Sequence, residues 1–247
     1  MTAQKSILIT GATRGLGKHL ADHFAQRGYR LALTGRKATD LSELKSELSK
    51  TGANVITETL DVTDYDAIKP VINRCAEQLD GIDIVIANAG VALTTPAGKG
   101  HFAEIRQTID VNLTAAIATC EAAVELFRVQ GRGQIVGVTS VAGVRGMPES
   151  GIYSATKAAF GRYLQAVRIE TRTENIVVTE LAPGFIDTDI NRSMPSRPFL
   201  VSAEKGTAAM ADLIEKEVEF RYVPSWPWSV VAPVIRMLPQ RVMASMR

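Results

Sequence analysis

The chain has 247 residues, of which 46% are hydrophobic and 22% charged, and these proportions exclude a disordered or fibrous protein. Its 28 Lys and Arg residues stand against 26 Asp and Glu residues, so we expect no nucleic-acid partner, which would require a concentrated positive field. No segment approaches a transmembrane length of apolar residues, and two cysteines without metal spacing favour a reducing, cytoplasmic location.

Short β-branched runs alternate with longer helical stretches along the chain. Strands are predicted over 6–10, 30–34, 54–58, 82–87, 134–139 and 176–181, with a last strand over 219–223. Several runs are apolar throughout, as expected when helices cover both faces of a parallel sheet. Helices are predicted near 15–27, 39–50, 64–79, 103–129, 152–174 and 229–238. The alternation predicts one α/β domain over 1–247, a doubly wound parallel sheet of about seven strands with helices on both faces.

A glycine-rich segment follows the first predicted strand directly. Its sequence, TGATRGLG, has the spacing G-x-x-x-G-x-G and runs into a helical pattern from Lys18. Glycines let the backbone approach a pyrophosphate closely, and the start of the next helix presents free N–H groups to it. The alternative is a tight strand–helix turn without a ligand. The predicted dinucleotide-binding residues of this loop are Gly11, Thr13, Arg14, Gly15, Leu16 and Gly17.

The end of the second predicted strand indicates which dinucleotide binds. An Asp or Glu there would bind the ribose hydroxyls of NAD(H). Gly35 and Arg36 stand at this place instead, and Arg14 lies inside the glycine loop. A guanidinium binds a 2′-phosphate with two hydrogen bonds, whereas an acid repels it. The sequence therefore predicts NADP(H), held by Arg14 and Arg36 with help from Thr34 or Lys37, against the alternative of two ordinary surface arginines.

Tyr153 and Lys157 lie four residues apart at the start of a predicted helix, so both side chains share one helix face. A phenol with its ordinary pKa of about 10 is a poor acid at neutral pH. An adjacent ammonium favours the phenolate and brings this pKa toward neutrality. Ser140 follows the strand at 134–139, where its hydroxyl would hydrogen-bond a substrate oxygen.

With these elements the chain resembles the short-chain dehydrogenase/reductase superfamily over residues 5–225. The resemblance rests on TGATRGLG, Asp61 in LDVT, NAG at 88–90, Asn112 in IDVNL, Ser140, Tyr153-x-x-x-Lys157, and Pro183-Gly184 with Thr188. It implies a single-domain Rossmann-like fold and an NAD(P)-dependent oxidoreductase acting on alcohol or carbonyl groups.

The resemblance also implies the roles of four catalytic residues. Tyr153 would be the general acid in carbonyl reduction, or the base in alcohol oxidation. Lys157 would lower the pKa of Tyr153 and bind the nicotinamide ribose. Ser140 would orient the carbonyl and stabilise its developing negative charge, as preplaced hydrogen-bond donors do in a transition state. Asn112, in a kinked helix, would position a water that connects Lys157 to solvent.

Further cofactor contacts are implied at the ends of the strands. Those on the adenosine side are Asp61, Val62, Asn88, Ala89 and Gly90. Those on the nicotinamide side, besides Tyr153 and Lys157, are Pro183, Gly184, Ile186 and Thr188. The carboxylate of Asp61 would reach the adenine, and Thr188 would reach the carboxamide or a phosphate.

Three departures from the family pattern are visible. Thr156 replaces a common Ser and keeps the hydroxyl, and Gly137 replaces a common Asn. The V-D-G-G segment that closes a tetramer in many members is missing from the C-terminal extension at 225–247, which contains both tryptophans. This extension would pack over the substrate pocket or a partner subunit, lie on a membrane surface, or cap the core. We expect a homodimer through the helices with Cys120 and Tyr153 rather than a tetramer.

Ligands of a doubly wound sheet bind beyond the carboxyl ends of its strands. The loops at 91–95, 141–151 and 185–200 meet there, and a substrate lid is predicted over 185–205. The candidate pocket residues are Leu93, Val141, Arg145, Met147, Phe185, Met194 and Phe199. Their apolar majority favours a hydrophobic carbonyl substrate, whereas Arg145, Arg192 and Arg197 would attract an anionic group.

Taken together, the residues predict an NADPH-dependent oxidoreductase that reduces an apolar ketone or aldehyde to the alcohol, or the reverse. A β-ketoacyl-thioester reductase is the alternative within this chemistry. A non-catalytic NADPH-binding regulator and a membrane-surface lipid enzyme are alternatives from other classes, although the presence of Ser140, Tyr153 and Lys157 argues against a regulator. No metal is expected, because His19 and His23, four residues apart, fit a solvated helix face better than a metal site.

Overall fold

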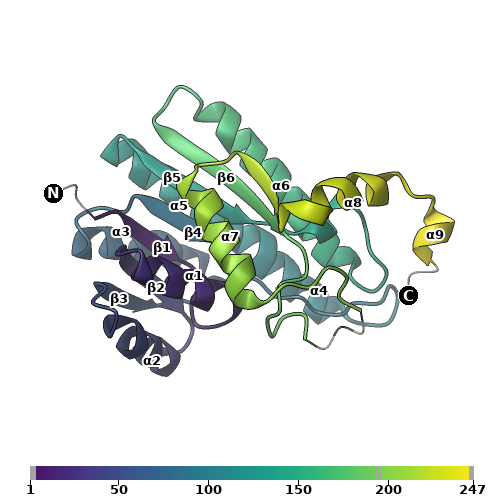
Figure 1. Ribbon diagram of the computed structural model, residues 1–247, viewed down its shortest axis with the longest axis horizontal. Helices are drawn as coiled ribbons and strands as arrows, with labels where there is room; N and C mark the ends of the chain where they lie inside the picture. Colours follow the sequence, from purple (N-terminus) through teal and green to yellow (C-terminus); the bar gives the residue numbers. More distant parts are fainter. Residues whose placement is uncertain (1–3, 193, 195, 245–247) are drawn as a thin grey trace.

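A computed structural model describes residues 4–192, 194 and 196–244 of the chain (Figure 1). Its centre is a seven-stranded sheet in the order β3-β2-β1-β4-β5-β6-β7, and every neighbouring pair is parallel. The strands are β1 Ser6–Ile9, β2 Arg30–Gly35, β3 Val55–Thr59, β4 Ile84–Ala87, β5 Gly133–Val138, β6 Ile176–Pro183 and β7 Phe220–Val223. The predicted single-domain, doubly wound fold is confirmed, and each predicted strand is present within two residues of its expected ends.

Helices cover both faces of the sheet (Figure 1). The helices are α1 Gly15–Gln26, α2 Ala38–Ser49, α3 Tyr65–Gln78, α4 Phe102–Ile109, α5 Ala115–Gln130, α6 Gly151–Glu170, α7 Ala203–Glu215, α8 Ser225–Met237 and α9 Gln240–Ala244. One apolar core joins the sheet to α1, α2 and α7, and a second joins it to α3, α5 and α6. Ile7 and Ile9 of β1 belong to the first core and Leu8 to the second. Successive strand residues point to opposite faces, so a sheet covered on both sides needs the uninterrupted apolar run seen in the sequence.

The helix predicted over 103–129 is present, with an interruption at Asn112. The segment consists of α4, a π-helical turn η1 at Asp110–Thr114, and α5. The cause is a contact that hydropathy does not reveal: Asn112, fully buried in the turn, binds the backbone of Val91 through both ends of its amide. π-turns inside helices occur often at functional sites, and this one lies beside Lys157.

The segments predicted as lid and C-terminal extension include residues 193, 195 and 245–247, which lie outside the described residues. Of the lid at 185–205, the last part already belongs to α7, and Ile186 pairs with Val201 in an isolated parallel bridge. The extension forms α8 and α9, which project beyond the sheet (Figure 1). α8 packs against β7 and against the 3₁₀ turn η2 at Val141–Val144. Among the described residues, no helix has the length and apolar character needed to cross a bilayer.

Candidate active site

The predicted functional residues meet at the carboxyl edge of the sheet. Parallel strands end at one common edge, so the loops after β1, β4, β5 and β6 are brought together there. Gly15 and Thr188 show how close these loops come: a Cβ on Gly15 would lie 3.8 Å from Cβ of Thr188. The glycine loop and the segment after β6 therefore face each other across a narrow gap.

The glycine loop leaves no room for side chains. Gly11 has a φ of 65°, and a Cβ on it would lie 2.9 Å from Cα of Ala89. A Cβ on Gly17 would lie 2.3 Å from the carbonyl oxygen of Gly11 and 2.7 Å from Nδ2 of Asn88. Any side chain at these two positions would force the loop away from the segment after β4.

Asn88 holds this loop in place. Its Nδ2 donates to the carbonyl oxygens of Thr10 and Gly11 at 2.9 and 3.2 Å. The Thr10 hydroxyl accepts the backbone N–H groups of Asn88 and Ala89 and donates to the carbonyl of Ile86. The side chain of Asn88 thus stabilises the glycine loop itself.

The residues present fit a dinucleotide. Helix α1 begins at Gly15 without a side-chain cap from Arg14 and without an acid in its first turn. Its first N–H groups and its positive dipole end are therefore available to a phosphate. Arg14 and Arg36 are both exposed near this position, and Thr13 packs against Gly35, whose Cβ would lie 2.8 Å from the Thr13 methyl.

Asp61 has a local role besides the one implied for it. Its carboxylate accepts the backbone N–H and the hydroxyl of Thr63 at 3.0 and 2.8 Å. These two hydrogen bonds, aided by the charge of Arg36, lower the pKa of Asp61. The carboxylate is therefore ionised at neutral pH and held at the rim of the site, while Val62 beside it is buried.

Ser140, Tyr153 and Lys157 lie together where β5 ends and α6 begins. The side chain of Ser140 hydrogen-bonds to Tyr153, accepts the N–H of Ala142 at 3.1 Å, and lies 3.4 Å from the carbonyl of Pro183. Nζ of Lys157 lies 5.9 Å from the centre of the Tyr153 ring and donates to the carbonyl of Val138 at 2.8 Å. The two hydroxyls and the amine thus lie near one another, and these three residues are called the polar row.

Burial controls the pKa values of this row. It lowers the pKa of Lys157 to about 8, because the buried ammonium loses its contact with water. Burial also raises the pKa of Tyr153, and the hydrogen bond from Ser140 opposes this rise. In the chain alone the pKa of Tyr153 therefore lies above its ordinary value, because burial removes the phenolate from water.

Asn112 lies in the π-turn beside Lys157. A Cβ on Gly90 would lie 3.3 Å from Oδ1 of Asn112 and 3.7 Å from Nζ of Lys157, so Gly90 keeps this space open. The amide of Asn112 accepts from the Val91 N–H at 2.8 Å and donates to the Val91 carbonyl at 2.7 Å. Its side chain therefore fixes the loop after β4 against the π-turn.

Two of the implied nicotinamide contacts are turned into the domain. Ile186 is buried in the core against α7, where a Cβ on Gly206 would lie 2.8 Å from the Ile186 side chain. The Thr188 hydroxyl donates to the Ile186 carbonyl at 3.3 Å and is buried as well. Ile186 can therefore face a cofactor only through its backbone, whereas Pro183 and Gly184 lie directly beside Ser140.

The apolar pocket candidates fall into two groups. Phe185 and Phe199 pack around Trp228 of α8, with ring centroids 6.2 and 5.5 Å from its ring. Val141 opens the turn η2, against which α8 packs. Met147 lines a hollow between the loops at 95–99 and 147–151. The two remaining candidates, both half-buried, are Leu93 and Met194.

The three arginines predicted as an anion-attracting group are used elsewhere. Arg145 donates through Nη1 to carbonyls at the end of α8, those of Ile235 and Arg236 at 3.2 and 3.1 Å, and that of Leu238. Arg192 pairs with Asp189 at 2.8 Å, and Arg197 with Asp187 at 2.6 Å. The lid arginines are thus neutralised, and Arg145 anchors the C-terminal extension, which sequence reasoning missed.

The structure explains why a glycine stands at position 137. A Cβ at this position would lie 2.2 Å from Cδ1 of Leu164 and 3.0 Å from Cε1 of Phe160, both on α6. The glycine therefore lets α6, with Tyr153 and Lys157, lie close against β5. No short-range sequence signal indicates this contact, since it joins positions 137 and 164.

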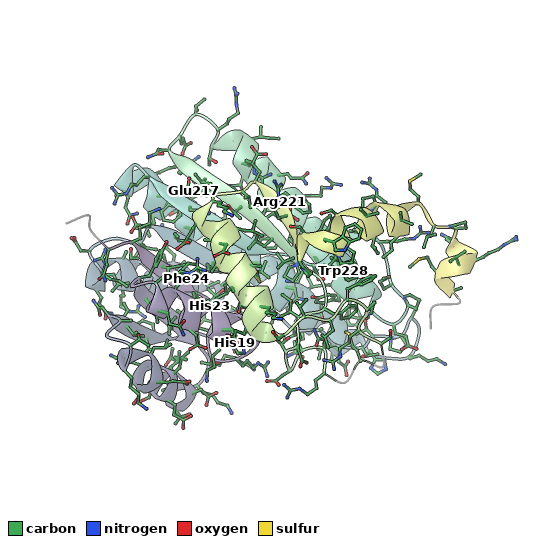
Figure 2. All side chains as sticks on the ribbon, viewed as in Figure 1. His19, His23, Phe24, Glu217, Arg221 and Trp228 are labelled. Carbon is green, nitrogen blue, oxygen red and sulfur yellow. The ribbon has the colours of Figure 1, made fainter. Side chains whose placement is uncertain are left out.

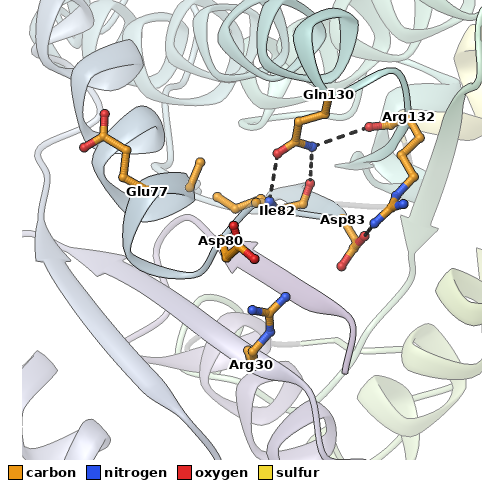
Figure 3. Close-up of a pocket in the computed structure, with 9 residues that line it drawn as sticks. Arg30, Glu77, Asp80, Ile82, Asp83, Gln130 and Arg132 are labelled. Atoms are coloured by element: carbon orange, nitrogen blue, oxygen red, sulfur yellow. Dashed lines mark hydrogen bonds and ion pairs between the residues drawn. The ribbon is translucent and has the colours of Figure 1, made fainter. Parts of the chain in front are cut away.

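Two features lie away from this edge. A surface pocket at the amino edge of the sheet is lined by Arg30, Asp83, Gln130 and Arg132 among others (Figure 3). Several of its polar groups are paired with one another: Gln130 binds both backbone groups of Ile82, and Arg132 pairs with Asp83 at 3.1 Å. On α1, His19 and His23 are labelled in Figure 2, and the described residues contain no cluster of three metal-ligating side chains.

Comparison with known proteins shows the family to which this chain belongs. The sequence profile of the family described as short chain dehydrogenase matches residues 5–198. The chain belongs to this family, and it is an NAD(P)-dependent oxidoreductase.

Three individual relatives are informative. An uncharacterized oxidoreductase of Mycobacterium tuberculosis is 36% identical over 245 residues, 98% of this chain and 96% of that protein. A 3-oxoacyl-[acyl-carrier-protein] reductase of Synechocystis is 30% identical over 201 residues, 81% of each chain. Among solved structures, an alcohol dehydrogenase of Thermococcus sibiricus complexed with 5-hydroxy-NADP is 28% identical, with a TM-score of 0.80 over 90% of this chain and 95% of that one.

Proposed function

We propose that the protein is an NADPH-dependent carbonyl reductase that converts an apolar ketone or aldehyde to the alcohol, or catalyses the reverse. The observation that carries this proposal is the polar row of Ser140, Tyr153 and Lys157 beside a glycine cradle at one sheet edge. Phe185 and Phe199 pack around Trp228, whose indole lies over Gly184, and an aromatic cluster of this kind suits a hydrophobic carbonyl compound.

Each residue of the row has one task in this reaction. The bound dinucleotide supplies the hydride, and negative charge then develops on the substrate oxygen. Ser140 donates a hydrogen bond to that oxygen, and Tyr153 transfers its phenolic proton to it. Lys157, charged below its pKa of about 8, stabilises the phenolate that remains. Asn112 positions the water through which Lys157 exchanges protons with solvent. The backbone of the π-turn holds this water, because the side-chain amide of Asn112 is already hydrogen-bonded to Val91.

The preference for NADP(H) is part of the proposal and rests on Arg14 and Arg36. Both are exposed at the start of α1 and the end of β2, and no acid stands at that strand end. The Thermococcus sibiricus relative, whose structure holds 5-hydroxy-NADP, supports the same choice. Thr34 is fully buried, so Lys37 is the better placed of the two helpers.

Replacing Arg14 and Arg36 together by Ala should weaken NADPH binding by about 10²-fold or more, because each charge-assisted hydrogen bond contributes about 1.5–3 kcal/mol. NADH binding should change little, since NADH has no 2′-phosphate. Titration calorimetry with both cofactors measures the two affinities, and Lys45→Ala on the exposed side of α2 is the control for the loss of a surface charge. Equal losses for NADPH and NADH would refute the phosphate clamp.

The thioester reductase alternative receives its support from the Synechocystis relative. The arginines that would attract an acidic carrier do not favour it, because Arg192 and Arg197 are paired with lid acids and Arg145 is bound to α8. We therefore keep the apolar carbonyl as the substrate class. The lid over 185–205 and the extension over 225–247 are proposed to cover the pocket.

We further propose a cytoplasmic homodimer formed through α5 and α6. Val129 on α5 and Ile169 on α6 are 88% and 73% exposed, large apolar side chains that a partner would cover. Val129→Glu with Ile169→Glu should shift the mass in light scattering from dimer to monomer, whereas Lys69→Glu on α3 should not. An unchanged mass would refute this interface.

The membrane alternative rests on Trp226 and Val230, which are exposed on α8. Sedimentation with anionic vesicles tests it.

The test of the proposed function is a screen of NADPH oxidation over ketones, aldehydes, quinones and β-ketoacyl thioesters. The expected result is turnover of apolar ketones or aldehydes that is absent in the Tyr153→Phe variant. If the enzyme turned over only β-ketoacyl thioesters, the thioester would replace the apolar carbonyl compound as the proposed substrate class. Turnover of none, with NADPH bound normally, would leave the regulator as the better account.

A further inference from the structure

The C-terminal extension places one side chain inside the catalytic region. Trp228 of α8 is 3% exposed and lies where the helix meets the body of the domain (Figure 2). Its indole covers the backbone of Gly184 so closely that a Cβ on Gly184 would lie 2.1 Å from Nε1. Pro183, one residue earlier, has its carbonyl 3.4 Å from Oγ of Ser140. The indole N–H is therefore beside the segment that borders the catalytic hydroxyls.

The indole N–H of Trp228 is buried and has no hydrogen-bond partner in the described part of the chain. Buried polar groups in native proteins are almost always paired, and a buried Trp N–H usually finds an acceptor. A donor left unpaired beside a catalytic site, and not in a remote core, is explained most directly by an acceptor that arrives with a ligand.

The surroundings of Trp228 show what kind of ligand this is. Phe185 and Phe199, both from the predicted lid, pack against the indole at 6.2 and 5.5 Å between ring centroids. Phe199 is 49% exposed and has a φ of 58°, a left-handed conformation that is strained for a bulky residue. A lid residue of this kind can move aside and let an aromatic ligand take its place against the indole.

The position of α8 is fixed independently of any ligand. Nη1 of Arg145 binds the carbonyls of Ile235 and Arg236 at the end of the helix, and Arg145 directly follows the turn η2. Since η2 begins one residue after Ser140, the catalytic serine and the indole are held in one framework. Trp228 is thus preorganised, as a binding group must be.

We propose that Trp228 determines substrate specificity in the catalytic pocket: its ring forms a wall for an aromatic carbonyl compound, and its N–H donates to a second oxygen acceptor on that compound. This inference rests on the proposed function, since it names the substrate class of the same site. It assigns the extension a direct part in binding, beyond covering the pocket.

The test compares two aldehydes of similar shape, para-acetylbenzaldehyde, which has the second acceptor, and para-isopropylbenzaldehyde, which lacks it. Trp228→Phe keeps an aromatic ring and removes the N–H. This variant should lose about five- to tenfold in kcat/KM for the acetyl compound, the usual effect of one neutral hydrogen bond, and little for the isopropyl compound. The matched control is Trp226→Phe, the same substitution two residues away at a side chain that is 76% exposed.

A binding measurement separates this inference from the proposed function. The chain contains two tryptophans, so Trp226→Phe leaves Trp228 as the source of the single indole N–H signal in a ¹H–¹⁵N spectrum. With NADP⁺ present, para-acetylbenzaldehyde should move this signal downfield, and para-isopropylbenzaldehyde should not. If the indole signal shifts but no compound is turned over, the inference about Trp228 stands and the proposed reductase function falls.

Three results would overturn the inference. One is an indole signal that the acetyl compound leaves unchanged at millimolar concentration. Another is an equal loss of kcat/KM for both aldehydes in Trp228→Phe, which would leave only a ring contact. The third is a Trp228→Phe variant that loses only affinity for NADPH, which would show that the indole N–H binds the cofactor and not the substrate.

Discussion

Replacing Tyr153 by Phe should lower kcat/KM for carbonyl reduction by about 10²–10⁴-fold, the usual contribution of a positioned general acid. The variant keeps the ring beside Lys157 and removes only the hydroxyl that hydrogen-bonds to Ser140. NADPH affinity should stay nearly unchanged, because the glycine loop and the start of α1 do not depend on this hydroxyl. Steady-state rates together with calorimetric NADPH binding measure both effects.

The control for this variant lies on the same helix. Tyr163 of α6 hydrogen-bonds through its hydroxyl to Glu121 of α5, away from the catalytic row. Tyr163→Phe makes the same chemical change and should leave kcat/KM within a small factor of the parent. If Tyr153→Phe retained the parent rate, Tyr153 would have no part in the chemistry and the enzyme mechanism proposed here would fall.

Replacing Lys157 by Met should abolish most activity and, at the same time, stabilise the fold at neutral pH. The pKa of Lys157 falls from 10.5 to about 8 on burial, so the folded state binds its proton less tightly than the unfolded chain does. Holding the ammonium in the buried site at pH 7 therefore costs stability, on the order of 1–3 kcal/mol after allowing for the lost hydrogen bond to Val138. Met has a similar length and needs no water.

The sign of this effect gives the variant a distinctive pH dependence. Between pH 8 and pH 10.5 the unfolded lysine holds a proton that the folded lysine has released, so the parent gains stability as the pH rises through this window. The advantage of Lys157→Met should shrink over the same range. Denaturant unfolding at several pH values measures the difference in stability between variant and parent. The control is Lys69→Met, at an exposed lysine that pairs with Glu125. A variant less stable than the parent at pH 7 would contradict the assigned cost of burial.

The fold and most of the site could be predicted from the sequence because their signals are local. Apolar runs such as 82–87 mark strands, and TGATRGLG or Tyr153-x-x-x-Lys157 holds its chemistry within a few residues. The side chain of Lys157 also lies where the helix spacing places it, beside the Tyr153 ring.

What the sequence did not reveal depends on contacts between distant segments. The π-turn exists because Asn112 binds Val91, and Arg145 caps a helix that begins eighty residues later. Asn88 looked like a ribose ligand, yet its amide holds the glycine loop. Trp228 carried no motif, and only its placement over Gly184 connects it with the catalytic residues.

The contact between Gly137 and Leu164 has a consequence for exchanging residues with relatives. Because a Cβ at 137 would meet Cδ1 of Leu164 at 2.2 Å, the asparagine found here in many family members cannot be accepted alone. It would displace the Leu164 side chain, and where that side chain cannot give way it would shift α6 together with both catalytic side chains. The two positions therefore have to change as a pair, with a smaller residue at 164, and variation at one in natural or engineered sequences should be accompanied by compensating variation at the other.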